Sequence, residues 1–402
     1  MHLLLIHQNF PGQFRDLAPA WLASGHQVTA IGSMAEAPSG LQWQGLTYLQ
    51  YRFEQAPSHL QRGLAVARLV EQLLDQEDPP DLVMSHSAWG EALCLQRVCG
   101  DVPLISYPEL WGNSRSLGFG FDQALAGFEP DPTSFSSANL IAELAVFQSS
   151  AAVVASRSQL LSFPPELQQR LTLLPEGVDL ERIKPDPNAC LHLSEQALEF
   201  RAGQPLVTFI SRDLEPLRGL RQLLKAWPLV SQALPEAQLV LVGGTGQGYG
   251  LQPPKGEDHF VDALEQLPDT LNREQIHHLG PLPHAAMLTL LQCSACHVAL
   301  SYPYTLSWSV LEALACAAPI ISNPDSPIAV ELHRDATDAL ALVPFNDAEG
   351  LASRMIELLQ QPQQARALGA AGRDWIERHG GLSKAMEGYE QLFQKVREQV
   401  VT

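Results

Sequence analysis

Short apolar runs alternate with segments of helical periodicity along the first half of the chain. An apolar run at residues 2–7 leads into a turn-forming segment, and apolar residues then recur at helical spacing from Phe14 to Leu22. The alternation continues, with strands predicted at 28–32, 81–86, 102–107, 151–156 and 171–175 and helices at about 60–74, after Trp89 and at 140–147. Most of these strands are continuously apolar, which is typical of a parallel sheet covered by helices on both faces.

The alternation stops at residues 175–190 and then restarts. The segment PEGVDLERIKPDPNAC is rich in proline and charge and lacks periodicity, as expected of an interdomain linker. Beyond it, strands are predicted at 205–211, 237–244, 275–280, 297–302, 319–322 and 339–344, and helices at 217–234, 285–291, around Glu312, and at 348–360, 364–378 and 382–400.

This order of elements predicts an α/β chain of two Rossmann-like, doubly wound domains that face each other across a cleft. We expect the domains at residues 1–180 and 181–380, with a last helix at about 381–402 that packs back onto the first. A chain of 402 residues suits this division, since single domains usually span about 100 to 200 residues.

The charge balance limits the possible partners. Lys and Arg number 25 against 44 Asp and Glu, and the net charge of −19 repels nucleic acid and anionic membrane surfaces. A local basic pocket must therefore carry out any anion binding. The N-terminus lacks the basic region of a secretion signal, and no window reaches the ~18 apolar residues of a membrane span, so we expect a cytoplasmic protein, with peripheral membrane contact left open.

The six cysteines show no spacing typical of a disulfide framework, and we interpret them as structural. Cys293, Cys296 and His297 form C-x-x-C-H, the spacing of c-type haem attachment. This motif runs into an apolar strand, and no second C-x-x-C pair accompanies it, so we expect neither haem nor a metal here.

The segment 300–321 reads as a strand end, a loop and a helix with a lone carboxylate, Glu312. The first turn of such a helix offers backbone N–H groups from Leu306, Ser307, Trp308 and Ser309, and these groups and the helix dipole favour an anion such as a diphosphate. The alternative is that Ser307 or Ser309 caps the helix and that Glu312 is solvated.

Basic residues gather after the strand at 205–211. Arg212 and Arg218 lie six residues apart around a Glu-Pro turn, and a loop can aim both guanidinium groups at one phosphate. Arg221 and Lys225 share a helix face, which we expect to be solvated. The alternative is that Arg212 and Arg218 are surface charges.

Several candidate residues follow the ends of predicted strands, where ligands of open parallel sheets bind. They are Gly12, His86, Arg212, Gly243 and Tyr304. The glycines of LVLVGGTGQGYG suit a tight turn beside a ligand but match neither a dinucleotide fingerprint nor a P-loop.

His86 ends an apolar strand, where it can bond a sugar hydroxyl or shuttle a proton. The alternative is a structural histidine. Trp89, Glu109 and Trp111 lie in the loops that flank it, and aromatic rings near carboxylates suit a sugar acceptor, although Trp89 equally fits a core position.

Taken together, these segments resemble the retaining glycosyltransferases of family four, which have the two-Rossmann GT-B fold. The likeness rests on SRDLEPLRGLRQLLKAWPLV, LVLVGG, IHHLGPLP, VALSYPYTLSWSVLEALACAAPII and VEL at Glu331, which follow in the family's order. HQNFPGQF, DLVMSHSAWGEAL and PEGVD look like a bacterial subgroup of the same family.

The resemblance implies that Glu312 holds the ribose hydroxyls of a nucleotide and that Arg212 and Arg218 hold its diphosphate. Backbone N–H groups near Ser307 and Trp308 would hold the distal phosphate. By the same resemblance, Gly12 lets the first loop approach the donor and His86 contacts the donor sugar.

The family pattern places two glutamates eight positions apart, and here Tyr304 stands at the first position. A phenol offers one donor and acceptor but no negative charge, so the departure bears on sugar identity and leaves phosphate binding intact.

The expected function is retaining, metal-independent transfer of a sugar from a nucleoside diphosphate sugar to a carbohydrate or lipid-linked acceptor, as in polysaccharide biosynthesis. Apart from this co-substrate no cofactor is expected, and no D-x-D-like metal clamp is evident. One alternative is a non-catalytic GT-B module or subunit that binds nucleotide sugars. A nucleotide-sugar epimerase is a further alternative, which the match around Glu312 supports less well.

Overall fold

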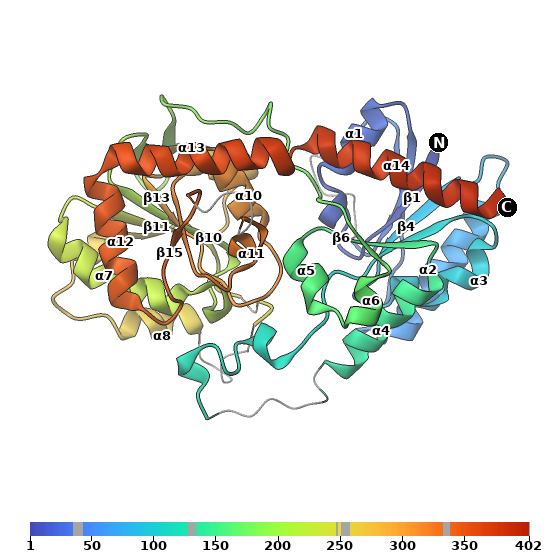
Figure 1. The fold of residues 1–402 in the computed structure, drawn as a ribbon, viewed down its shortest axis with the longest axis horizontal. Coiled ribbons are helices and arrows are strands. Elements are labelled where there is room, and N and C mark those ends of the chain that lie inside the picture. The colour runs from blue at the N-terminus through green and yellow to red at the C-terminus, as the bar shows by residue number, and fades with distance from the viewer. Residues whose placement is uncertain are drawn as a thin grey trace. The chain divides into compact units, whose positions relative to one another are not determined.

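The computed structural model describes residues 1–34, 43–127, 133, 135–246, 248–250, 258–332 and 338–401. The chain divides into two compact units, each built around a parallel sheet (Figure 1). The N-terminal unit comprises Met1–Asn113, Asp131–Asp179 and Gly380–Thr402, and the C-terminal unit comprises Ser114–Pro130 and Leu180–His379.

The N-terminal unit contains a seven-stranded sheet in the order β3-β2-β1-β4-β5-β6-β7, with every neighbouring pair parallel. Its strands are β1 (His2–Ile6), β2 (Gln27–Gly32), β3 (Leu46–Gln50), β4 (Leu82–His86), β5 (Leu104–Tyr107), β6 (Ala151–Val154) and β7 (Leu171–Leu173). All residues of β1, β4 and β5 are buried, in line with their mainly apolar sequences.

Helices cover both faces of this sheet. Alternate residues of a strand point to opposite faces, so a strand that is buried along its whole length needs helices on both sides. They are α1 (Leu17–Ala23), α2 (His59–Leu74), α3 (Leu95–Cys99), α4 (Ser136–Gln148), α5 (Arg157–Ser162), α6 (Pro165–Gln168) and α14 (Leu382–Val401). Leu3 and Leu5 of β1 belong to a core cluster that includes residues of α1 and α14, whereas Leu4 and Ile6 belong to one that includes residues of α2.

The last helix, α14, thus packs in the N-terminal unit although it lies at the end of the chain. The ring of Trp21 from α1 lies 5.6 Å from that of Tyr389 and 5.5 Å from that of Phe393. All three side chains are buried.

The C-terminal unit contains a six-stranded parallel sheet in the order β12-β11-β10-β13-β14-β15 and an antiparallel hairpin, β8–β9. The strands are β8 (Cys190–Leu193), β9 (Leu198–Arg201), β10 (Leu206–Asp213), β11 (Gln238–Gly244), β12 (Ile276–His278), β13 (Cys296–Val298), β14 (Ile320–Ser322) and β15 (Ala341–Leu342). The helices are α7 (Leu220–Ala233), α8 (His259–Glu265), α9 (His284–Cys293), α10 (Trp308–Ala315), α11 (Pro327–Leu332), α12 (Ala348–Gln360) and α13 (Pro362–His379).

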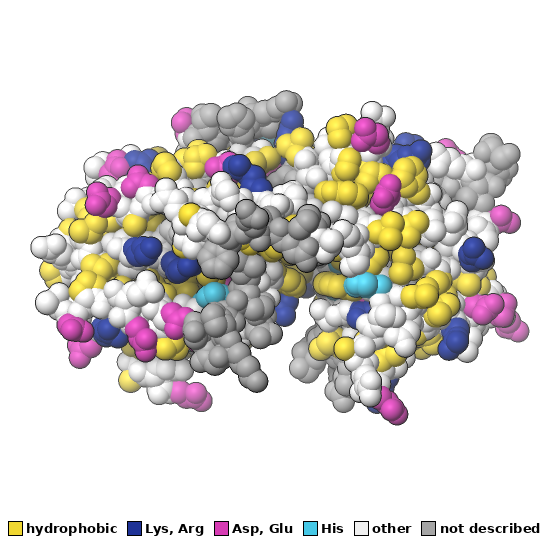
Figure 2. All heavy atoms as spheres, turned by 90° about the horizontal axis from the view of Figure 1, so that it is seen from below, with side chains coloured by type: hydrophobic (Ala, Val, Ile, Leu, Met, Phe, Trp, Pro, Cys, Tyr) yellow, Lys and Arg dark blue, Asp and Glu magenta, His cyan; other side chains and the backbone are white. Residues whose placement is uncertain are grey.

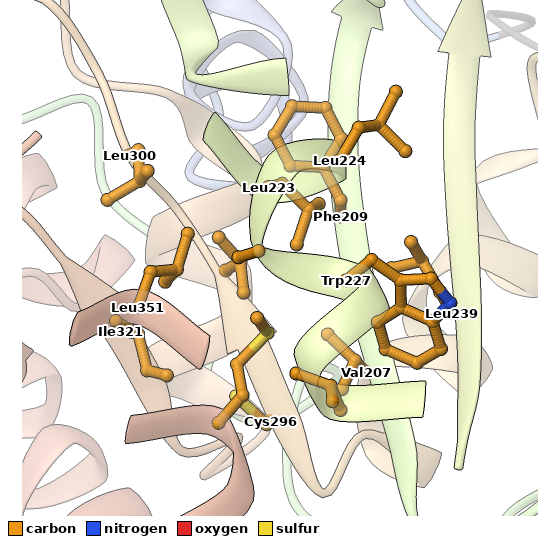
Figure 3. Packing of buried hydrophobic residues seen from close by; sticks show 14 of the residues in the cluster. Val207, Phe209, Leu223, Leu224, Trp227, Leu239, Cys296, Leu300, Ile321 and Leu351 are labelled. Carbon is orange, nitrogen blue, oxygen red and sulfur yellow. The ribbon is translucent and has the colours of Figure 1, made fainter. Parts of the chain in front are cut away.

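The core of this unit lies on both sides of β10. Val207 and Phe209 pack with Trp227 of α7 and Leu351 of α12, as Figure 3 shows. Leu206 belongs instead to a cluster with residues of β11, α9 and the β8–β9 hairpin. This hairpin begins at Cys190, the last residue of the predicted linker, and continues through a stretch for which the apolar pattern indicates no element.

Residues Ser114–Pro130 group with the C-terminal unit, whereas the predicted boundary assigns them to the first domain. Asp122 explains this placement, because its buried carboxylate accepts a hydrogen bond from the Tyr302 hydroxyl at 2.6 Å and lies 3.3 Å from Arg221 Nη2. The predicted solvated position of Arg221 is therefore wrong. Such contacts are distant in sequence and leave no periodic signal.

All six cysteines lie in the described residues and are free thiols. Cys293, Cys296 and His297 are buried, and His297 Nδ1 lies 2.9 Å from Thr208 Oγ1. Burial lowers the pKa of His297 to about 4 and raises the pKa of Cys296 to about 12. The motif thus packs as a neutral part of the core.

On the face drawn in Figure 2, side chains of both charges are scattered among hydrophobic and other residues. Across the described ranges, none of the helices combines the length and the apolar character that crossing a membrane requires.

Candidate functional site

Helix α10 begins at Trp308, so Leu306 lies in the preceding loop and Ser307 is the N-cap residue. Within the described residues no side-chain hydrogen bond caps this helix; the Ser307 hydroxyl lies 2.8 Å from that of Ser309, which donates to the Ile210 carbonyl at 3.3 Å. Ser307 thus occupies the cap position, as the alternative predicts, but its side chain makes no capping hydrogen bond in the described structure. An N-terminus without a capping side chain keeps backbone N–H groups available for an anion.

Arg218 lies at this helix start. It ends the short 3₁₀ helix Pro216–Arg218, and its Nη1 donates to Ser301 Oγ at 3.0 Å and to the Thr305 carbonyl at 3.1 Å. These bonds hold the guanidinium against the loop that precedes α10. Burial lowers the pKa of Arg218, but an arginine starts so high that it stays charged.

Arg218, Leu306 and Ser307 line one pocket of the C-terminal unit, together with residues of β10, β13 and α11. Gly219 allows the approach, because its φ is 80° and an added Cβ would lie 2.5 Å from Leu300 Cβ. A charged guanidinium beside a helix N-terminus is a combination that suits phosphate oxygens.

Arg212 takes a different position from the predicted one. Its side chain is 66% exposed, Nη1 donates to the Tyr249 hydroxyl at 2.5 Å, and the guanidinium lies 4.9 Å from the centre of that ring. The pocket residues that the structure describes include Arg218 but not Arg212.

Two tyrosine rings stand between the arginines. The Tyr304 ring lies 6.2 Å from the Tyr249 ring and 5.9 Å from the Arg218 guanidinium. Tyr304 is thus positioned next to Arg218. Each arginine lies at cation–π distance from one of the two rings, Arg212 from Tyr249 and Arg218 from Tyr304, and the two rings lie next to each other.

Glu312 is buried, with 1% of its surface exposed, so the alternative of a solvated carboxylate is wrong. Its Oε1 lies 2.7 Å from Nε2 of His284, the first residue of α9. Arg182 Nη1 lies 3.4 Å from His284 Nδ1. Since arginine can only donate, Nδ1 is the acceptor, and the imidazole then carries its proton on Nε2 and donates it to Glu312.

Neither His284 nor Arg182 is predicted from the sequence. His284 sits in IHHLGPLPH, three histidines within nine residues, and only the fold brings it to Glu312. Gly243 has a φ of 149°, and an added Cβ would lie 2.4 Å from the Ser211 carbonyl oxygen, so the close approach it permits is to β10.

The second cluster lies in the N-terminal unit, around His86 at the end of β4. The His86 ring is fully buried, and its Nε2 lies 3.2 Å from Glu109 Oε2. The rings of His7, Trp89 and Tyr107 lie 4.6, 4.7 and 5.6 Å from it. Three predicted residues, His86, Trp89 and Glu109, therefore meet.

His7 and Gln13 complete this cluster. Asn9 N donates to His7 Nδ1 at 2.9 Å. His7 therefore carries its proton on Nε2 and donates it to Gln13 Oε1. Gln13 Nε2 in turn donates to Glu109 Oε1 at 3.3 Å. Burial, and secondarily His86, holds the pKa of His7 well below its usual value. His7 is therefore neutral at pH 7.

Gly12 contributes space to this cluster. Its φ is 47°, and an added Cβ would lie 2.2 Å from the His7 ring. Sequence analysis misses His7 and Gln13, although both belong to the HQNFPGQF segment.

Trp111 lies apart from the other predicted acceptor-side residues. Its ring is 6.0 Å from that of Phe163, and its backbone N–H donates to Ser162 Oγ at 3.0 Å. Between the two groups of residues, Glu109 has a φ of 63°, in the left-handed region.

Two family models match the chain, one in each half. Residues 24–183 match the model described as Glycosyl transferase family 4 group, and residues 193–375 match the model described as Glycosyl transferases group 1.

Curated relatives match one half of the chain. The GDP-mannose-dependent monoacylated alpha-(1-6)-phosphatidylinositol monomannoside mannosyltransferase of Corynebacterium glutamicum is 30% identical over 213 residues, 51% of each protein. The D-inositol 3-phosphate glycosyltransferase of Segniliparus rotundus is 27% identical over 205 residues, 51% of this chain and 42% of that protein. The chain thus spans about half the length of these relatives.

Solved structures resemble the chain over nearly its whole length. Sucrose-phosphate synthase from Thermosynechococcus elongatus has a TM-score of 0.74 and 17% identity, covering 98% of this chain and 99% of that one. Anabaena HepE in complex with UDP-glucose has a TM-score of 0.71 and 17% identity, with coverage of 98% and 100%. The predicted GT-B fold is confirmed, and the two halves of the chain are similar to the family 4 group and to group 1 of the glycosyl transferases, respectively.

Proposed function

We propose that the protein is a retaining glycosyltransferase that moves a hexose from a nucleoside diphosphate sugar to a carbohydrate or lipid-linked acceptor in the cytoplasm. The observation that carries this proposal is the pocket of the C-terminal unit, where the Arg218 guanidinium meets the loop and N-cap residue of α10. A cation and a helix N-terminus on one pocket favour a group with several negative oxygens.

In this proposal the C-terminal unit holds the donor. Arg218 and the backbone N–H groups at Ser307 and Trp308 bind the diphosphate, and Leu306 lines its pocket. Glu312, fixed by His284, accepts hydrogen bonds from the ribose hydroxyls. Gly243 shapes the neighbouring turn, and Tyr304 stands where the sugar meets the diphosphate.

Breaking the bond between sugar and diphosphate leaves negative charge on the diphosphate oxygens. A guanidinium that two hydrogen bonds already hold in place stabilises this charge more in the transition state than in the ground state. Retention would follow if the leaving phosphate takes the acceptor proton on the face that the diphosphate leaves. This scheme uses no metal and no cofactor besides the sugar donor.

The N-terminal unit supplies the sugar-side residues in this proposal. Among the described residues, His86 Nδ1 is a buried ring nitrogen without a hydrogen-bond partner, while Nε2 is held at Glu109. A hydroxyl of a bound sugar would satisfy it. Trp89 adds an aromatic surface beside the same ring.

The comparisons support a nucleotide sugar as the donor. The names of the Corynebacterium relative and of the HepE complex specify GDP-mannose and UDP-glucose, both nucleoside diphosphate hexoses. We expect a donor of this class and leave its base and sugar to experiment.

The competing proposal is a GT-B module that binds a nucleotide sugar without transferring it. The tyrosine at position 304 favours this alternative, since it removes the carboxylate of the resembled pattern from the side of Arg218. Both proposals use the same donor site, so binding alone does not separate them.

A nucleoside diphosphate release assay across GDP- and UDP-hexoses, with glycan and lipid-linked acceptors, tests the proposal. We expect acceptor-dependent release, and an anomeric linkage in the product, read by NMR, that matches the donor. Binding in a thermal-shift panel without release on any acceptor supports the competing proposal. An inverted anomeric centre overturns the retaining mechanism.

A further inference from the structure

The β8–β9 hairpin carries a group of reactive side chains on one face. In its antiparallel register, His192 pairs with Glu199 and Cys190 pairs with Arg201. Since residues two apart on a strand share a face, these four side chains lie together. The opposite face carries Leu191 and Phe200, both buried in the core.

The four side chains are already in contact. Cys190 Sγ lies 3.2 Å from His192 Nε2, and His192 Nδ1 lies 2.8 Å from Glu199 Oε2. The other oxygen of Glu199 accepts a hydrogen bond from Arg201. One ligand atom from each of Cys190, His192 and Glu199 lies within 4.8 Å of the others.

We propose that Cys190, His192 and Glu199 form a zinc-binding site. Thiolate, imidazole and carboxylate are the ligand types of Zn²⁺, with bond lengths of about 2.0 to 2.3 Å, whereas Ca²⁺ and Mg²⁺ prefer oxygen ligands alone. Small rotations of the side chains close the distances, because His192 is 61% and Glu199 39% exposed. Water fills the fourth position.

Arg201 bonds one oxygen of Glu199, and His192 lies between the other oxygen and the half-buried thiol of Cys190. In the zinc site Arg201 keeps its bond to Glu199 Oε1 and orients the ligand from outside, as partners of metal-bound carboxylates do.

The site is complete within one hairpin of the C-terminal unit. In the part of the chain that the structure describes, none of its residues lines the Arg218 pocket. Zinc would therefore fasten two neighbouring strands and stabilise the unit, and it has no part in the proposed sugar transfer.

Competition for Zn²⁺ between the full-length protein and a chromogenic chelator measures the affinity of the protein for Zn²⁺. Substitution with Co²⁺ reports a thiolate ligand through a near-ultraviolet charge-transfer band. We expect one Zn²⁺ per chain. Cys190→Ser and His192→Gln should each weaken binding at least about 10- to 100-fold, the loss seen when even an outer partner of a metal ligand is removed. Cys94→Ser, which changes the other half-buried thiol, is the matched control.

Two results overturn the site. One is a wild-type Co²⁺ complex without the thiolate band. The other is a Cys190→Ser variant that binds Zn²⁺ as tightly as the wild type and the Cys94→Ser control. Because the four side chains face away from the core, the variants should keep the metal-free melting temperature of the wild type. Saturating Zn²⁺ should raise that temperature for the wild type and the control alone.

Discussion

At the scale of single residues, the charged side chains that we expect to bind the donor are those that the fold buries and holds by hydrogen bonds. Arg218 donates two hydrogen bonds to the loop before α10, whereas Arg212 is mostly exposed and rests on Tyr249. Sequence spacing treats these two arginines alike. Their different environments make Arg218 the stronger candidate for binding a diphosphate.

We predict that Arg218→Ala lowers kcat/KM for the nucleotide sugar by about a hundredfold, roughly 3 kcal/mol of transition-state stabilisation. Arg218→Lys should recover part of this loss, because a lysine keeps the charge but loses the fork of donors. Steady-state kinetics measure both variants. Arg354→Ala, which changes a paired arginine on α12, is the control, and equal rates for the wild type and Arg218→Ala would reject the role of Arg218.

His284 offers a second test at this scale. If it positions Glu312 for the ribose, His284→Ala should raise the KM for the donor severalfold and change kcat little. His284→Gln, whose amide can still donate to Glu312, should restore most of the affinity. A kcat loss without a KM change would instead indicate a role in the chemical step.

Sequence reasoning proposes Glu312, His86, Trp89 and Glu109 because strand ends and lone carboxylates leave local signals, and the structure places the last three together. It misses His284, since the contact with Glu312 joins two helices 28 residues apart. It also groups Trp111 with His86, whereas the Trp111 ring lies beside Phe163.

At the scale of elements, hydrophobic periodicity predicts nearly every strand of the two parallel sheets. Buried strand segments are rich in apolar residues, so β1 and the first halves of β4 and β10 stand out from the helices around them. The β8–β9 hairpin is missed because only one of its faces is buried and the strands have four residues each.

Strand β13 carries a pH-dependent contribution to stability. The buried His297 has a pKa of about 4, while the unfolded chain protonates the same ring near pH 6.5. As the pH falls from 6.5 to 4, this ring is protonated in the unfolded state but stays neutral in the folded state. The free energy of unfolding therefore decreases by about 1.4 kcal/mol per pH unit, about 3 kcal/mol in all.

We therefore predict that His297→Gln, which does not titrate, flattens the dependence of the unfolding free energy on pH between 7 and 5 by about 2 kcal/mol. Urea unfolding at several pH values measures this slope. An unchanged slope in His297→Gln would show that this ring titrates normally in the folded protein.

At the scale of the whole molecule, the chain crosses between the two units more often than a single linker requires. It leaves the N-terminal unit after Asn113, returns at Asp131, leaves again after Asp179 and returns at Gly380. Composition marks only the crossing near residue 180, where proline and charge accumulate. The other crossings depend on contacts of Asp122 and of α14 that are distant in sequence.

The return of α14 makes the stability of the N-terminal unit depend on the end of the chain. Phe393 is fully buried and packs against Trp21, so Phe393→Ala should cost the N-terminal unit about 3 to 5 kcal/mol. The C-terminal unit keeps its own core around Trp227 and should unfold as in the wild type. Calorimetry should therefore resolve an early transition in the variant, and hydrogen exchange should assign it to β1, β4 and α1. Lys395→Ala, at an exposed position of the same helix, should leave both transitions unchanged. If both units lose stability equally in Phe393→Ala, the two cores are energetically coupled and α14 does not belong to one of them alone.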